Sequence, residues 1–239
     1  MPWHNARGSI WRRPPSAARP ILIAQISDLH ITPPGVLAYD RVDTEAALLR
    51  TIDTLNLLSP RVDLVVISGD IANSARPDEY EHARTLLGAL QIPFAVIPGN
   101  HDRRTPMRKV FPDPAYGAAD SALNSMRSID ELDILLIDST VPGSPHGELD
   151  AATLAWLDGT LTTSATRPAI LFLHHPPFKT GIVYTRRDAA AECGFAGGGP
   201  QTSPARAVGG GGPCSSRGAN RIRRHLRQHL PGRRAGGDA

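Results

Sequence analysis

The chain has 239 residues, 41% of them hydrophobic, and a formal net charge of +3. Charged side chains give +4 to residues 1–20 and +6 to residues 189–239, which leaves −7 for residues 21–188. An acidic centre argues against nucleic-acid binding through a basic surface, and no apolar run is long enough to span a membrane. Cys193 and Cys214 lack the spacing of a thiolate metal site or a disulfide framework.

Strand-like and helix-like stretches alternate through residues 21–188, which is typical of an α/β fold with helices covering a sheet. Short aliphatic and β-branched runs predict buried strands over residues 21–27, 63–69, 94–99, 131–139 and 169–173. Helical spacing predicts helices over residues 43–58, 77–90 and 149–161. The first helix would begin at an Asp43 cap and bury Ala46, Ala47, Leu49, Ile52, Leu55 and Leu58.

The two ends of the chain differ from its centre. We predict that residues 1–20 are a disordered extension, because no apolar segment of a signal peptide follows Arg12 and Arg13, and we expect a cytoplasmic location. Residues 189–239 contain 12 of the 22 glycines and too few large apolar residues to offset the entropy of ordering. They are either a natural disordered tail or an out-of-frame translation of a GC-rich gene, and we favour the frameshift.

Candidate metal ligands directly follow four of the predicted strands. The first strand leads to Asp28 and His30, the second to Asp70, the third to Asn100 and the last to His174. In open α/β sheets the carboxyl ends of the strands form the edge where ligands bind. A mixed set of oxygen and imidazole ligands suits Fe, Mn, Zn or Co and does not choose among them.

Local spacing suggests how these residues share ions. Asp28 and His30 are two apart on a segment that we expect to be extended, so both side chains would face one ion. The Asp70 carboxylate has two oxygens and could bridge two cations. Adjacent histidines in a strand point to opposite faces; we choose His174 as the ligand, while His175 supports it or packs. The structural alternatives are an Asp turn and a core histidine for Asp28 and His30, a helix cap for Asp70 and a left-handed turn residue for Asn100.

Taken in order, these motifs resemble a known family. Asp28-Leu-His30, Gly69-Asp70, Gly99-Asn100-His101-Asp102 and His174-His175-Pro-Pro are similar to the motifs of calcineurin-like metallophosphoesterases. The intervals are most similar to the bacterial branch with class III cyclic nucleotide phosphodiesterases and glycerophosphodiesterases. The resemblance implies a metallophosphoesterase domain over residues 21–188, folded as a four-layer αββα sandwich. It also implies two metal ions: Asp28 and His30 bind the first, Asp70 bridges, and Asn100 and His174 bind the second.

The resemblance further implies an activity. A hydroxide activated between two divalent ions would hydrolyse a small phosphodiester of the cyclic nucleotide or glycerophosphodiester type. His101 would contact the phosphate and protonate the leaving group, and Asn73 would hydrogen-bond near the bridging solvent. Neither nucleic acid nor a membrane is an expected partner.

One motif of the family is absent from the sequence. A Gly-His-x-His motif, whose histidines would complete both metal shells, is expected after His174, but residues 213–218 contain no histidine. His225 and His229 follow in an arginine-rich segment without a strand before it. We therefore expect the sandwich to be incomplete on its C-terminal side. The alternative to a phosphodiesterase is an inactive or weakly active truncated member that binds metal poorly.

Overall fold

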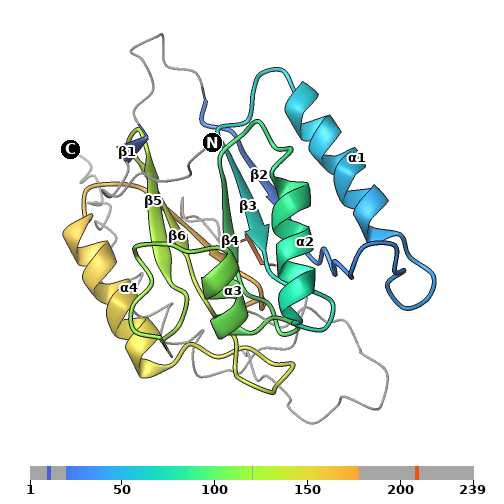
Figure 1. Cartoon of the computed structure of the whole chain (residues 1–239). Helices are drawn as coiled ribbons and strands as arrows, with labels where there is room; N and C mark the ends of the chain where they lie inside the picture. Colours follow the sequence, from blue (N-terminus) through green and yellow to red (C-terminus); the bar gives the residue numbers. More distant parts are fainter. Residues whose placement is uncertain (1–9, 12–19, 120, 178–207, 210–239) are drawn as a thin grey trace, which may run out of the picture.

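Two β-sheets lie face to face between helices in the computed structural model, which describes residues 10–11, 20–119, 121–177 and 208–209 (Figure 1). The smaller sheet is parallel, in the order β2-β3-β4. Its strands are β2 (Ile23–Ile26), β3 (Leu64–Ser68) and β4 (Phe94–Ile97). The larger sheet has the order β1-β5-β6-β7-β8, with only the β5–β6 pair antiparallel. Its strands are β1 (Ile10–Trp11), β5 (Ser125–Ile129), β6 (Leu132–Leu136), β7 (Ala169–Leu173) and β8 (Val208–Gly209).

Helices cover the outer face of each sheet. The helices α1 (Thr44–Leu57), α2 (Pro77–Leu87) and α3 (Arg104–Val110) lie on the smaller sheet, and α4 (Ala151–Thr163) lies on the larger one (Figure 1). Alternation along the strands makes both faces apolar. In β3, Val65 and Ile67 join the cluster under α1 and α2, while Leu64 and Val66 meet the other sheet. A third cluster joins the larger sheet to α4. The expected four-layer αββα arrangement is therefore confirmed.

The predicted helix start at Asp43 is also confirmed, because its Oδ1 accepts the Ala46 N–H at 2.8 Å. The expected apolar face of this helix was partly wrong. Leu48, which we did not select, is buried, whereas Leu49 and Leu58 are 37% and 45% exposed. The buried stripe of α1 runs through Leu48, Ile52 and Leu55, so the prediction was right for Ile52 and Leu55 and wrong for Leu49 and Leu58.

Both end segments lie almost wholly outside the described residues. Apart from Pro20, the structure describes within them only the pairs Ile10–Trp11 and Val208–Gly209, each a short strand on the larger sheet. The predicted disorder and frameshift, like the region where the Gly-His-x-His motif is absent, stay predictions. No helix in the described part of the chain is both long and apolar enough to cross a membrane.

Candidate metal centre

The predicted ligands gather at the carboxyl ends of four parallel strands. Asp28 and His30 follow β2, Asp70 follows β3, Asn100 follows β4, and His174 follows β7 in the other sheet. Because the two sheets pack face to face, these strand ends meet at one edge of the molecule. The site is thus built by both sheets, from loops up to about 150 residues apart in the sequence.

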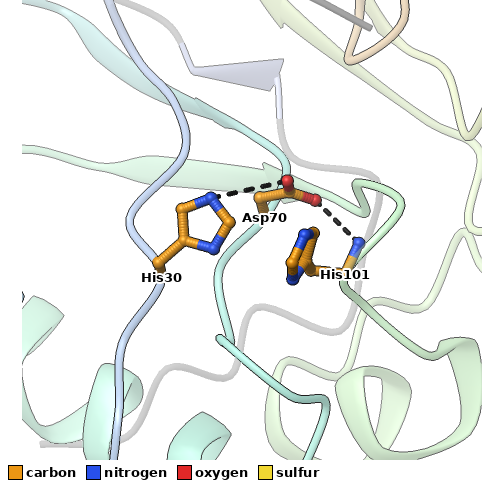
Figure 2. Close-up of side chains that lie close together, drawn as sticks. All are labelled: His30, Asp70 and His101. Atoms are coloured by element: carbon orange, nitrogen blue, oxygen red, sulfur yellow. Dashed lines mark hydrogen bonds and ion pairs between the residues drawn. The ribbon is translucent and has the colours of Figure 1, made fainter. Parts of the chain in front are cut away.

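Asp70 is the centre of this arrangement. Its carboxylate is buried, with Oδ2 at 3.7 Å from His30 Nε2 and Oδ1 at 3.6 Å from His174 Nε2. Oδ1 also accepts the His101 backbone N–H at 2.9 Å. Figure 2 shows His30 and His101 on either side of the Asp70 carboxylate. One acidic side chain therefore contacts segments that follow three different strands.

Potential ligand atoms form two groups that share Asp70. One group contains His30, Asp70 and His101, the other contains Asp28, Asp70 and His174, and within each the atoms lie within 4.8 Å of one another. Asn100 extends the second group, because its Oδ1 is 3.1 Å from His174 Nε2. Two groups of oxygen and nitrogen atoms around a common carboxylate suit two divalent cations.

The hydrogen bonds of His174 leave one ring nitrogen available as a ligand. Its Nδ1 donates to the Ser68 carbonyl at 2.8 Å, so Nε2 is the ring nitrogen that can coordinate a metal ion. That nitrogen faces two oxygens, Asn100 Oδ1 and Asp70 Oδ1. An imidazole nitrogen, an amide oxygen and a carboxylate oxygen therefore converge on one point, and all three are metal-ligand atoms. The residues present therefore fit a metal ion at this point.

His30 is suited to coordination by its charge state. Burial lowers its pKa, and the neighbouring His101 and His174 lower it as well, although Asp70 and Asp28 act in the opposite direction. Its buried Nδ1 has no hydrogen-bond partner. A neutral imidazole does not have to lose a proton before it binds a metal ion.

Asp28 and His30 do not have the extended geometry that we expected. Their φ angles are +58° and +45°, in the left-handed region, and Asp70 has a φ of +51°. The extended backbone on which the period-two argument depended was therefore wrong, whereas the assignment of both side chains to one ion stays a prediction. Left-handed conformations are costly for residues with a Cβ and are concentrated at functional sites. Three of them among the predicted ligands support a functional role for this edge.

The His101 ring is held in place by Asn73, which we predicted to bind substrate. Its Nδ1 donates to the backbone carbonyl of Asn73 at 2.8 Å, which leaves Nε2 available to a ligand or a proton. We had expected a role for the Asn73 side chain, but the contact that the structure gives it with His101 is through its backbone. Grouping of His101 with His30 and Asp70 was not part of our prediction.

The buried carboxylate of Asp102, to which we assigned no role from the sequence, organises the loops around the site. Asp102 accepts backbone N–H groups of Ile71 and Ala72, each at 3.1 Å, and of Gly99 at 2.9 Å. It also accepts the Tyr80 hydroxyl at 3.0 Å. Burial raises the pKa of Asp102 to about 6, although the backbone donors favour its charged form. Asp102 thus joins the loops that carry Asp70 and Asn100 to helix α2.

His175 has the supporting position that we predicted for it. It is buried, its Nδ1 is 2.8 Å from Ser139 Oγ, and its ring packs edge-on against His174 with centroids 4.9 Å apart. Burial lowers its pKa to about 3, so the ring is neutral at physiological pH. A Cβ at Gly147 would overlap this ring, which explains the glycine there. His175 therefore fixes the orientation of its neighbour from the second face of the strand.

A small pocket opens beside the ligand groups. Its volume is about 260 Å3. The loops that follow β3, β4 and β6 line it. The lining residues are Asn73, Ser74, Asn100, His101, Arg103, Gly143, Ser144 and Pro145. Sequence reasoning missed Arg103. It also missed residues 143–145, because nothing in their local sequence connects this loop after β6 with ligands that follow the strands of the smaller sheet.

Comparison with known proteins gives a consistent result. Residues 21–202 match the calcineurin-like phosphoesterase family. A probable glycerophosphodiester phosphodiesterase of Arcobacter nitrofigilis is 35% identical over 162 residues, which are 68% of this chain and 59% of that protein. A glycerophosphodiester phosphodiesterase of Enterobacter lignolyticus is 37% identical over 163 residues, covering 67% and 59%.

Cyclic nucleotide phosphodiesterases are similar as well. A cAMP/cGMP dual specificity phosphodiesterase of Mycobacterium tuberculosis is 35% identical over 178 residues, which are 71% of this chain and 55% of that protein. The chain therefore spans between 55% and 59% of the length of these three relatives.

Proposed function

Because the chain belongs to the calcineurin-like phosphoesterase family, we propose that it is a metal-dependent phosphodiesterase acting on small phosphodiesters. The observation that carries this proposal is the convergence of metal-ligand side chains on Asp70, with His174 Nε2 facing the oxygens of both Asp70 and Asn100. Relatives named for glycerophosphodiester and cyclic nucleotide hydrolysis support the same reaction. Nucleic acid is not expected as a substrate, and the cytoplasmic location stays a prediction.

Five residues would hold the metal in this proposal. Asp28, Asp70, Asn100 and His174 lie together on one side, and His30 approaches Asp70 from the other. Two ions of Fe, Mn, Zn or Co would share the Asp70 carboxylate. Divalent cations held in this way act as Lewis acids on phosphoryl oxygens and increase the acidity of water.

His101 would move the proton that the leaving alcohol needs. Its backbone N–H donates to Asp70 and its Nδ1 donates to Asn73, so the ring is held beside the carboxylate with Nε2 available. Nε2 would hold a proton and pass it to the alkoxide oxygen as the ester bond breaks. The pocket beside His101 would receive the alcohol part of the ester.

Hydrolysis of bis(p-nitrophenyl) phosphate tests this function. Protein stripped with EDTA is expected to show no turnover, and added Mn²⁺ should restore it. Asp70→Asn, which removes the charge of the shared ligand but keeps the size of its side chain, should lower kcat/KM by at least about 100-fold. Turnover without metal, or full activity in the Asp70→Asn variant, would contradict the proposal.

A further inference from the structure

Two neighbouring arginines after the Asn100 loop differ in what their guanidinium groups contact. Arg104 donates from Nε to the buried Asp138 carboxylate at 2.7 Å and from Nη2 to the Thr140 carbonyl at 2.9 Å. Arg103 donates from Nη1 to the Asp102 carbonyl at 3.0 Å and has no carboxylate partner in the described part of the chain. The charge of Arg104 is therefore balanced inside the fold, whereas that of Arg103 is open to a ligand.

The backbone of Arg103 is fixed although its side chain is exposed. Its N–H donates to the phenol oxygen of Tyr80 at 2.8 Å, and this buried hydroxyl in turn donates to Asp102. Arg103 is two residues after His101, so the guanidinium starts from an anchored point beside the proposed reacting centre. Anchoring of the backbone reduces the entropy lost when the side chain binds a ligand.

The pocket that Arg103 lines has a definite chemical character. No Asp or Glu is among its lining residues as the structure describes them, and Arg103 is the one permanent charge there. Four side chains, Asn73, Ser74, Asn100 and Ser144, add amide and hydroxyl groups. A volume of about 260 Å3 lies below the usual range for drug-sized ligands, so the pocket suits a small group.

We infer that Arg103 selects phosphodiesters in which one alcohol is small and carries a carboxylate. This rests on the proposed function, because the pocket is assigned to the alcohol part of the same ester. The planar guanidinium has paired N–H donors that match the two oxygens of a carboxylate. With no acidic side chain in the pocket, nothing there repels a second negative charge on the substrate.

Two substrates that differ only in charge test this selection. They are phosphate diesters of p-nitrophenol with glycolate and with glycolamide. Chromatographic measurement of p-nitrophenyl phosphate, the product that remains when the small alcohol leaves, gives kcat/KM for both with the Mn²⁺-loaded protein. The wild type is expected to prefer the glycolate ester about tenfold, since hydrogen bonds to charged groups contribute at least that much. In Arg103→Gln the ratio should fall to about one. Arg50→Gln, which removes an exposed arginine of α1, should keep the wild-type ratio.

A binding measurement separates this inference from the proposed function. Calorimetric titration of the Mn²⁺-loaded protein with 2-phosphoglycolate and with its amide should give Kd values about tenfold apart in the wild type and equal in Arg103→Gln. Equal Kd values in the wild type, an unchanged ratio in Arg103→Gln, or no binding of either compound would overturn the inference. Preferential binding without hydrolysis of either ester would support the Arg103 assignment and contradict the proposed function.

Discussion

Two glycines determine how closely the backbone approaches Asp70. A Cβ on Gly99 would overlap the Asp70 carboxylate and its backbone nitrogen, and a Cβ on Gly69 would overlap His174 and the Gly99 backbone. Gly69 also has a φ of +98°, which is strained for residues with a Cβ. The loops after β3 and β4 can therefore meet only because these positions carry no side chain.

Gly99→Ala should damage both stability and activity. The added methyl has no free space and must displace Asp70, so we expect a loss of about 2–3 kcal/mol in the free energy of unfolding, together with loss of Mn²⁺-dependent turnover. Urea unfolding monitored by circular dichroism gives the free energy.

Gly159→Ala is the matched control for this change. This glycine is exposed in α4, and nothing lies within 4 Å of an added Cβ. Alanine should stabilise the helix there by about 0.5–1 kcal/mol and leave turnover intact. If Gly99→Ala and Gly159→Ala have the same free energy of unfolding and the same turnover, close packing against Asp70 is not the reason for a glycine at position 99.

Much of the site was predictable at the level of residues because ligand-type side chains stand directly after apolar strands. Asp28, His30, Asp70, Asn100 and His174 were selected in this way, and the structure brings them together. The sequence could not give the backbone conformation at Asp28, since aspartate adopts left-handed geometry more often than most residues but only in a small fraction of cases. It also could not reveal Arg103, which looks the same as Arg104 until their partners are seen.

At the scale of elements, one buried carboxylate ties α3 to the larger sheet. Asp138 lies just after β6 and accepts hydrogen bonds from Arg104 and from the backbone N–H groups of Leu123 and Thr140. Arg104 is the first residue of α3, directly after the Asn100–Arg103 loop. The pair therefore links the loop of the smaller sheet to the edge of the other sheet, across the two halves of the site.

Arg104→Met should destabilise the protein by about 3 kcal/mol, because it leaves a fully buried carboxylate without its cation. Arg84→Met removes an arginine from a surface pair with Glu81 in which both side chains are more than half exposed. That control should change stability by less than about 0.5 kcal/mol. Urea unfolding of both variants measures the difference, and equal losses would show that the Asp138 pair adds nothing.

Apolar strands and amphipathic helices were predictable from the sequence, and polar elements were not. The strands β3, β4 and β7 and the helices α1, α2 and α4 correspond to predicted segments, because burial on one or both faces leaves a periodic pattern. The helix α3 has seven residues, with three basic side chains and a proline, and shows no apolar stripe. The strand β5 is similarly polar, and its place is set by pairing with β6 rather than by its own composition.

At the scale of the whole molecule, packing of two sheets creates the site. Ligands from the smaller sheet meet His174 from the larger one only because the apolar faces of β3 and β4 pack on those of β6 and β7. Neither sheet alone carries the full ligand set. Stability of the sandwich and metal binding should therefore be coupled, since an ion that binds only the folded state also stabilises it.

The count of metal ions held by the folded chain tests the central claim most directly. Stripped protein is dialysed against Mn²⁺, and bound manganese per chain is measured by mass spectrometry for the wild type and for Asp70→Asn. If Asp70 is the shared ligand, the wild type retains two ions and the variant retains at most one. A wild type that retains none, or a variant that retains as many ions as the wild type, would contradict a metal centre built around Asp70.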